Sequence, residues 1–166
     1  MSLRALSLTV AALLALAAPA ALAQSLTVVG LDGVTTALSA QELAKLPRGE
    51  VQTRWGDKAQ TFQGPRLAYA LRAAGVPMGA RLHGDPLMAY LVVTGADGFQ
   101  AVYSLAEVDG DFHEGAAILA DAVDGEKLPD KQAPWRLVLT GDKKSWRSVY
   151  AVTRIEVKSA GKGHAH

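Results

Sequence analysis

Hydrophobic and polar residues alternate with a two-residue period over much of the chain, which is the pattern of β-strands with one buried face. The alternation is longest near the carboxyl end, in SVYAVTRIEV at residues 148–157. Shorter segments predict strands at residues 25–33, 51–64, 88–94, 99–104, 117–123, 127–129 and 135–140. Turn residues at Gly56-Asp57, at 95–98 and at Asp124-Gly125 indicate hairpins within this series.

Two segments carry helix signals instead. Ser39 and Glu42 have the spacing of a capping box, and Pro47 ends the apolar pattern that follows, so a short helix is predicted there. In GPRLAYALRAAGV, residues 64–76, Pro65 suits a first helical turn and Gly75 suits the position just past a helix end. Apolar side chains recur at helical spacing in this segment, at Leu67, Ala70, Leu71 and Ala74.

The balance of these elements predicts the fold class. Ser104 and Glu107 repeat the capping-box spacing and predict one more helical turn. Strands still outnumber helices, and hairpins dominate. We therefore expect an α+β fold with mixed, largely antiparallel sheets and a few short helices.

The amino-terminal residues have the pattern of a secretory leader. Arg4 gives a positive start, residues 8–20 are apolar but short for a membrane span, and ALA at residues 21–23 is a small-residue cleavage site. We expect a signal peptide over residues 1–23, one globular domain over 24–158 and a disordered tail over 159–166. The predicted location is the periplasm, and a single-span anchor is the alternative interpretation of the leader.

Composition narrows the classes of function. The chain has 17 Lys and Arg residues against 16 Asp and Glu, and loss of Arg4 with the leader makes the two counts equal. Non-specific binding to nucleic acid needs a strong basic excess, so no nucleic-acid partner is predicted. The sequence contains no cysteine, which excludes disulfides, cysteine nucleophiles and thiolate metal ligands from this chain.

Common catalytic motifs are also missing from the sequence. It has no G-x-S-x-G, no P-loop, no dinucleotide fingerprint and no H-E-x-x-H. His83 and His113 have no partner at the spacing of a catalytic or zinc motif. We therefore predict neither a catalytic residue nor a metal-binding residue.

The segment TGDKKSWRSV, residues 140–149, gathers the chemistry of a binding site on one tight turn. Its cations would neutralise a phosphate, which arginine holds bidentately, and its indole would stack on a flat heterocycle. Hydroxyls and an Asp carboxylate would bond to the edge of that ring. The candidate residues are Asp97, Asp142, Lys143, Lys144, Ser145, Trp146, Arg147 and Ser148. The alternative is a charged hairpin turn whose tryptophan packs on a neighbouring strand; Trp55 and Trp135 are expected to be packing residues.

Four segments, taken in order, resemble the oxidoreductase molybdopterin-binding domain of the sulfite oxidase superfamily. They are TFQGPRLAYALRAAGV, VTGADGFQAVYSLAEV, ILADAVDGEKLP and APWRLVLTGDKKSWRSVYAVTRIEV, within residues 61–157. The resemblance implies the sulfite-oxidase-type fold. It also implies that the last segment wraps the pterin and phosphate of the molybdenum cofactor. Gly141, Arg147 and Ser148 then stand at cofactor-contacting positions, and Asp97 stands near the mouth of the pocket.

The sequence departs from the family pattern in ways that bear on chemistry. Tyr150 and Ala151 replace a lysine and a tryptophan of the family motif. The enzymes ligate molybdenum through a cysteine in an upstream segment, and this chain has no cysteine. The resemblance therefore implies a pterin site without the metal ligand, as in small exported members of the superfamily that bind reduced pterins and report them to a membrane partner.

Three functional interpretations follow. The first is a periplasmic, non-catalytic protein that binds a pterin or molybdopterin-like ligand without molybdenum, as an accessory to a membrane-bound sensor or receptor. The second is a molybdopterin-dependent oxidoreductase. The third is an interaction module with an empty site.

Overall fold

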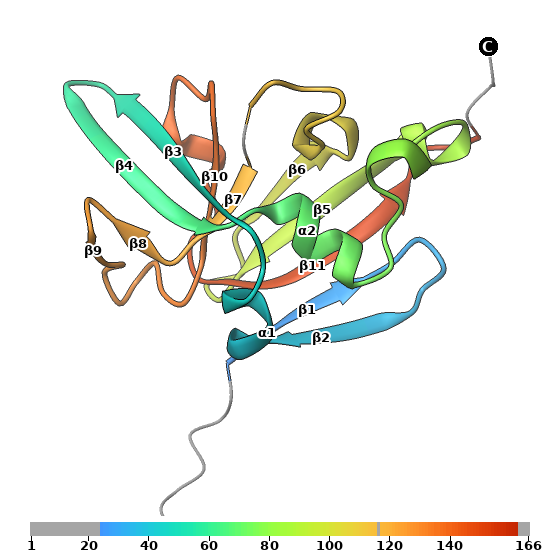
Figure 1. Cartoon of the computed structure of the whole chain (residues 1–166), viewed down its shortest axis with the longest axis horizontal. Helices are drawn as coiled ribbons and strands as arrows, with labels where there is room; N and C mark the ends of the chain where they lie inside the picture. Colours follow the sequence, from blue (N-terminus) through green and yellow to red (C-terminus); the bar gives the residue numbers. More distant parts are fainter. Residues whose placement is uncertain (1–23, 116, 163–166) are drawn as a thin grey trace, which may run out of the picture.

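A five-stranded mixed sheet forms one side of the molecule in the computed structural model, which describes residues 24–115 and 117–162 (Figure 1). Its strands, in spatial order, are β2 Thr35–Ser39, β1 Ser25–Val29, β11 Val152–Ser159, β5 Ala89–Gly95 and β6 Gln100–Ser104. Only the β1–β11 pair is parallel; the other pairs are antiparallel. The proposed leader and the last four residues of the proposed tail lie outside the described residues.

A long hairpin makes the second sheet. Strand β3, Arg48–Trp55, pairs with β4, Lys58–Pro65, around the predicted turn at Gly56-Asp57, and the short strands β8 Ala122–Val123 and β9 Glu126–Lys127 extend it. Between the two sheets lies an antiparallel ribbon of β7, Ala117–Ala120, and β10, Arg136–Leu139. The three sheets have mixed or antiparallel pairing, as predicted for this α+β fold.

The β7–β10 ribbon is buried on both faces, so its alternate residues feed two hydrophobic cores. Leu119, Leu137 and Leu139 belong to the large core under the five-stranded sheet. Ile118 and Val138 belong to a smaller core under the β3–β4 hairpin. Position 136 has the same phase as position 138, so the side chain of Arg136 points towards the hairpin rather than into the large core.

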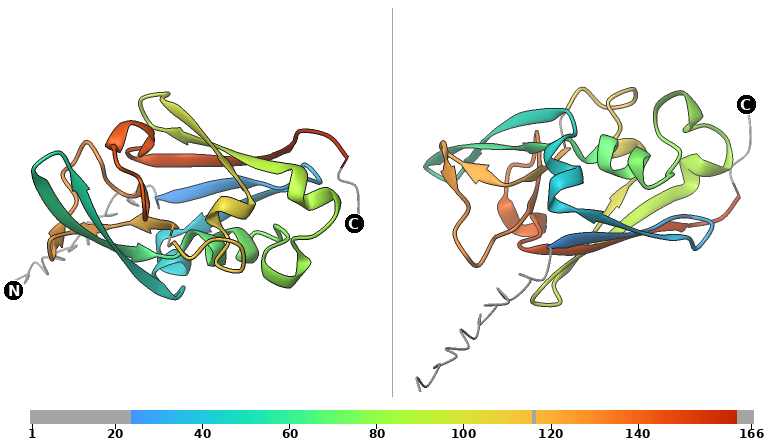
Figure 2. Two further views of the ribbon diagram at one scale, coloured as in Figure 1. Left: turned by 90° about the horizontal axis from the view of Figure 1, so that it is seen from above. Right: turned by 60° about the horizontal axis from the view of Figure 1, so that its bottom comes forward.

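Two helices cover one side of the five-stranded sheet (Figure 2). Helix α1, Ala40–Ala44, has the predicted capping box, in which the Ser39 hydroxyl accepts from the Glu42 amide. Helix α2, Leu67–Ala73, ends before Gly75, whose φ of +84° is the left-handed conformation expected there. Pro65 is not in the first helical turn as predicted: it ends β4, and Arg66 is the N-cap of α2.

Four 3-10 turns complete the described secondary structure. They are η1 Gly79–Arg81, η2 Asp85–Met88, η3 Ala106–Val108 and η4 Ser145–Arg147. The turn η3 is the one predicted from Ser104 and Glu107, and the Ser104 hydroxyl accepts from the Glu107 amide at 3.1 Å.

The carboxyl-terminal strand is shorter at its start than predicted. Strand β11 begins at Val152, because Val149 and Ala151 bond to the neighbouring segment at Leu137 and Gln132. An irregularity between Val152 and Arg154 then shifts the alternation by one residue, so Val152 is buried and Thr153 is exposed. The strand continues to Ser159.

Candidate functional site

The candidate binding segment is the loop between β10 and β11, and two aromatic side chains from distant strands hold it. The indole Nε1 of Trp55 donates to the backbone oxygen of Asp142 at 2.9 Å. The hydroxyl of Tyr103 donates to the backbone oxygen of Arg147. At the start of the loop, Gly141 has a φ of +89°, which a residue with a side chain rarely adopts. The loop geometry is thus set by the fold rather than by its own sequence alone.

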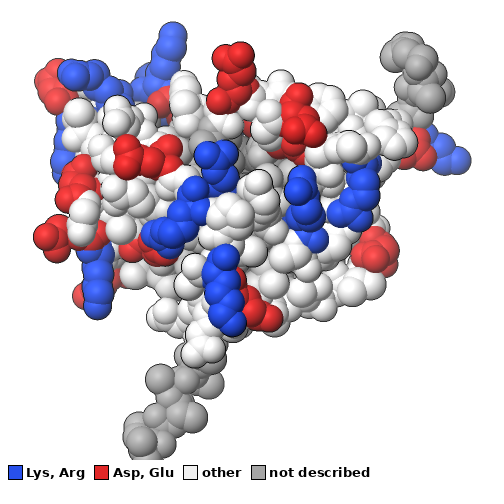
Figure 3. Space-filling view, viewed as in Figure 1, with Lys and Arg blue, Asp and Glu red and all other residues white. Residues whose placement is uncertain are grey.

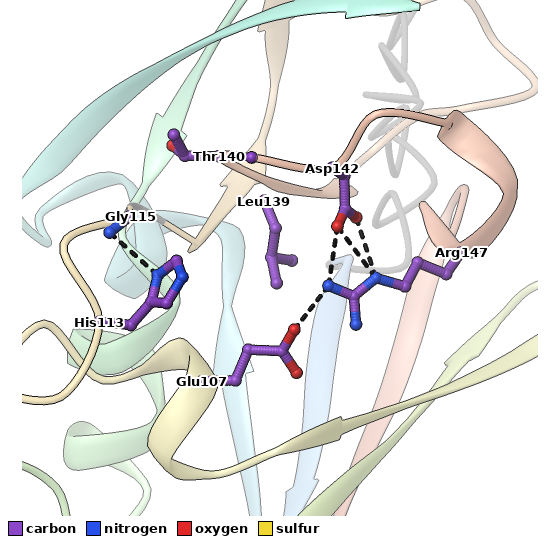
Figure 4. A pocket seen from close by; sticks show the side chains of 8 residues that line it. Glu107, His113, Gly115, Leu139, Thr140, Asp142 and Arg147 are labelled. Atoms are coloured by element: carbon purple, nitrogen blue, oxygen red, sulfur yellow. Dashed lines mark hydrogen bonds and ion pairs between the residues drawn. The ribbon is translucent and has the colours of Figure 1, made fainter.

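The guanidinium of Arg147, in this loop, bonds to the carboxylates of Asp142 and Glu107 (Figure 4). Its Nε and Nη2 contact the Asp142 carboxylate at 2.7–3.1 Å, and Nη2 lies 2.5 Å from Oε1 of Glu107. Hydrogen bonds to Asp142, and then to Glu107, raise the pKa of the Arg147 guanidinium above its usual value. These groups line a cavity of about 140 Å³, the Arg147 cavity, together with His113, Gly115, Leu139, Thr140 and Gly141.

This arrangement changes the electrostatics expected of the loop. Arg147 was expected to meet an anionic ligand, but the structure surrounds its guanidinium with the carboxylates of Asp142 and Glu107. An anionic ligand that approached Arg147 would meet these two negative charges. Direct contact between Arg147 and a ligand stays a prediction.

A second arginine, Arg136, has the opposite environment. Its side chain is only 3% exposed and makes no ion pair with any described carboxylate. The guanidinium carbon lies 4.8, 4.7 and 4.4 Å from the ring centroids of Trp55, Phe62 and Tyr150. Burial lowers the pKa of Arg136 below its usual value. The result is a buried positive charge that is stabilised by aromatic faces and neutral acceptors.

Ser148 belongs to the surroundings of Arg136. Its hydroxyl accepts from Nε of Arg136 at 2.8 Å and donates to the backbone oxygen of Leu137 at 2.6 Å. Gln132 accepts from Nη1 of Arg136 at 2.9 Å. The hydroxyl of Ser148 is therefore already bonded at both its donor and its acceptor side, although the residue lines a surface hollow.

The side chain of Trp146 is 78% exposed, so it does not pack on a neighbouring strand as the alternative interpretation required. The ammonium of Lys144 lies 4.2 Å from the centroid of the indole ring and covers one of its faces. Lys143 and Lys144 make no ion pair among the described residues. With Asp142, Trp146 and Arg147 they line an open hollow of about 410 Å³, which we call the lysine shelf.

A smaller hollow of about 220 Å³ also includes Trp146. This Trp146 hollow is lined by Asp97, Phe99, Ser145, Trp146, Ser148 and Tyr150. Oδ1 of Asp97 accepts from the Phe99 amide at 2.9 Å, and Oδ2 has no partner among the described residues. The structure thus brings Asp97, predicted from a separate hairpin, to the same hollow as Trp146.

The predicted site residues therefore divide among three places. Gly141, Asp142 and Arg147 line the Arg147 cavity; Lys143 and Lys144 line the lysine shelf; Asp97, Ser145, Trp146 and Ser148 line the Trp146 hollow. Sequence reasoning missed Arg136, Glu107, Phe99 and Tyr150. Glu107 had been named only for its capping-box spacing, and Tyr150 only as a departure from the family motif.

Comparison with known families agrees with the geometry. Residues 15–165 match the family model described as the oxidoreductase molybdopterin binding domain. The chain belongs to this family. No curated protein matches the chain.

The molybdopterin-binding fold is also seen in a solved structure. The sulfane dehydrogenase SoxCD from Paracoccus pantotrophus superposes with a TM-score of 0.60 and 20% sequence identity, over 81% of this chain and 38% of that chain. The present chain thus spans less than half of that dehydrogenase. At this level of identity the similarity establishes a common fold.

The residues of this chain fit the pterin part of a molybdopterin cofactor better than they fit its molybdenum. A planar heterocycle with an anionic substituent suits the exposed indole and the groups beside it, which are Oδ2 of Asp97 and the two lysines, none of them paired with another described residue. The metal has no comparable donors: the chain has no cysteine, and the described residues contain no group of three or more His, Asp or Glu arranged to hold a metal ion.

Proposed function

We propose that this molybdopterin-binding-domain protein is a periplasmic pterin-binding protein that carries out no redox chemistry. The observation that carries the proposal is the exposed indole of Trp146 beside a hollow that also contains Asp97, Phe99 and Tyr150. A large apolar indole is usually packed against other side chains, but this one lies in solvent on a loop that Trp55 and Tyr103 hold in place. Stacking on a ligand would explain the exposure.

The Trp146 hollow supports binding of a flat bicyclic ring. Lys144 covers one face of the indole, so the ring would stack on the other face. Asp97 would accept hydrogen bonds from the amino-pyrimidinone edge through its free Oδ2, and Ser145 would bond to the ring periphery. Stacking of a nucleobase on an aromatic side chain contributes about 1–3 kcal/mol, and a pterin presents a ring of similar kind.

The surrounding charges support an anionic substituent on the ligand. Lys143 and Lys144 have no carboxylate partner among the described residues. The buried guanidinium of Arg136 lies behind Tyr150, which forms part of the wall of the hollow. Positive charge in a poorly solvated site acts over a longer range than charge in water, so Arg136 also favours an electron-rich ligand.

The absence of redox chemistry is inferred from the ligands that this chain can offer. Bound molybdenum would supply electron and oxygen-atom transfer, and the enzymes of the family hold it with a cysteine thiolate. No residue of this sequence can donate sulfur as a thiolate. The role proposed for the chain is therefore to hold and orient a pterin ring.

The proposed location and partner rest on the leader-like amino terminus. A periplasmic domain that binds a small ligand reports it across the inner membrane only through another protein, so we propose a membrane-bound sensor or receptor as the partner. In the part of the chain that the structure describes, no helix combines the length and apolarity needed to cross a bilayer.

The proposal is tested by fluorescence titration of the mature protein with reduced and oxidised pterins. Trp146→Ala should weaken binding at least about tenfold because it removes the stacking surface, whereas Trp146→Phe should retain most of the affinity. Phe112→Ala is the matched control, since Phe112 is an exposed aromatic residue that lines none of the three site hollows.

Two results would overturn the proposal. Stoichiometric molybdenum in protein from a cofactor-competent host would favour the oxidoreductase. A lack of heat or fluorescence change with every pterin would favour the interaction module with an empty site.

A further inference from the structure

A further cavity adjoins the Arg147 cavity at Gly115, which lines both. It has a volume of about 130 Å³ and is lined by Arg66 and Arg72, which lie at the two ends of α2, and by Tyr69, Asp109 and Asp111. We call it the α2 cavity. Basic side chains lie on either side of α2 on the face shown in Figure 3. None of the residues proposed above for pterin binding lines it.

Arg66 is positioned by strand β3. A side-chain carbon on Gly49 would lie 3.2 Å from Cγ and 3.4 Å from Nε of Arg66, so the arginine stem lies directly against the glycine backbone. Nε makes a long contact of 3.5 Å to the backbone oxygen of Arg48. The side chain of Arg48 itself holds the Asp121 carboxylate at two points, at 2.6 and 2.8 Å. The terminal nitrogens of Arg66 have no partner among the described residues.

Arg72 is positioned by an aromatic ring and another glycine. Its guanidinium carbon lies 5.4 Å from the centroid of the Tyr69 ring. Its Nη2 lies 3.0 Å from the place that a side-chain carbon on Gly79 would occupy. Arg72 forms no ion pair with any described residue. Two oriented guanidinium groups therefore line the same small cavity.

The formal charges of the cavity lining balance, with Arg66 and Arg72 against Asp109 and Asp111, but neither arginine forms an ion pair among the described residues. The Asp109 carboxylate is buried and bonds to backbone amides, at 2.5 Å to Gly79 and 2.9 Å to Asp111. Those bonds hold it in place as part of the wall. Asp111 is the exposed carboxylate of the lining, and its Oδ2 lies 3.2 Å from the Gly79 side-chain position that Nη2 of Arg72 also approaches.

We propose that the α2 cavity binds a phosphate group between Arg66 and Arg72. The guanidinium fork matches the oxygen spacing of phosphate and bonds to it bidentately. The volume suits a compact tetrahedral anion rather than a ring system. The phosphate group is either inorganic phosphate or the phosphorylated side chain of a larger ligand.

The test is a titration of the mature protein with inorganic phosphate, followed by amide and arginine side-chain NMR signals at low ionic strength. We expect saturable shifts at Arg66, Arg72 and Gly110, which border the cavity. Arg66→Gln and Arg72→Gln should each weaken binding by about tenfold because each removes a charged donor pair. Arg54→Gln is the control, since Arg54 is an exposed arginine at the other end of β3, next to the hairpin turn, and does not line the α2 cavity.

Trp146→Ala separates this site from the proposed pterin site. It should leave phosphate binding unchanged, so failure of either proposal is recognised independently of the other. A phosphorylated and an unphosphorylated pterin distinguish the two sources of phosphate. If the phosphorylated one binds more tightly and Arg66→Gln removes the difference, the phosphate belongs to the ligand side chain. If saturating pterin leaves phosphate binding intact, the site takes the free anion.

The proposal is wrong if phosphate gives no saturable shift, or if Arg66→Gln and Arg72→Gln bind phosphate as well as the parent. Equal weakening by Arg54→Gln would also overturn it, because a general loss of positive charge would then explain the effect. Unfolding midpoints of all variants show whether each is folded before binding is compared.

Discussion

Two arginines close to the candidate site have opposite surroundings. Arg136 is buried among three aromatic rings and has no carboxylate partner among the residues that the structure describes, whereas Arg147 is 39% exposed at its side chain and contacts two carboxylates. The sequence made no prediction for Arg136 and predicted a ligand contact for Arg147, which stands in a basic loop. The structure shows that its charge is balanced internally and that the charge of Arg136 is not.

The two arginines therefore have different roles. Arg147 helps to fix the shape of the loop, and Arg136 supplies positive charge to the site. An exposed ion pair contributes little to the free energy of unfolding, although it can fix the shape of a loop. A buried cation without an anion costs free energy unless its surroundings or a ligand compensate it. Arg136 is therefore the stronger candidate for long-range attraction of an anionic ligand.

The largest effect is expected from Arg136→Ala. It leaves a void between Trp55, Phe62 and Tyr150 and removes a donor to Ser148, so the free energy of unfolding should fall by about 3 kcal/mol. Arg136→Met fills the same space without charge and should stay within about 1 kcal/mol of the parent. Urea unfolding measures both. If Arg136→Met is as unstable as Arg136→Ala, the charge itself stabilises the fold and the comparison fails.

A smaller effect is expected where Tyr103 supports the Arg147 side of the site. Tyr103→Phe removes the hydroxyl that donates to the backbone oxygen of Arg147 and should cost about 1 kcal/mol at neutral pH. Burial, the largest cause, raises the pKa of the Tyr103 phenol above its ordinary value of 10.0. The folded state thus favours the protonated form, and this stabilisation is lost as the pH rises above 10.

Unfolding measured across alkaline pH checks the sign. The parent should lose stability above the ordinary phenol pKa, and Tyr103→Phe should show a flatter alkaline profile. Identical profiles would mean that Tyr103 is not the group that responds.

The smallest effect is expected from the ion pair itself. Glu107→Gln should lower the free energy of unfolding by about 0.5 kcal/mol, because the pair is partly solvated. Asp121→Asn removes a comparable exposed partner of Arg48, at a distance from the loop, and should cost a similar amount. Only Glu107→Gln should also weaken pterin binding, by about twofold, through the loop that carries Trp146. Equal binding by both variants would show that the loop holds its shape without Glu107.

Local signals predicted most of the fold. The capping box of Ser39 and Glu42, the glycine after α2 and the hairpin turns all depend on neighbouring residues, and the structure has them. The start of β11 was predicted wrongly because the segment before Val152 bonds to Gln132 and Leu137, far away in sequence. A two-residue period does not show where such a long-range contact interrupts a strand.

The sequence predicted which segments form the candidate site but not the contacts within it; ligand binding there stays a prediction. The loop at residues 140–149 and the hairpin residue Asp97 do line neighbouring hollows. The pairing of Arg147 with Glu107 joins residues 40 positions apart, and the burial of Arg136 depends on a hairpin that precedes it by many residues. Neither contact leaves a local pattern in the sequence.

The ribbon of β7 and β10 has a consequence for unfolding. Since successive side chains of these strands belong to different hydrophobic clusters, loosening the ribbon exposes both clusters at once. The two halves of the domain should therefore melt in a single transition, and the arginine at the head of β10 keeps its aromatic enclosure only while both halves remain intact.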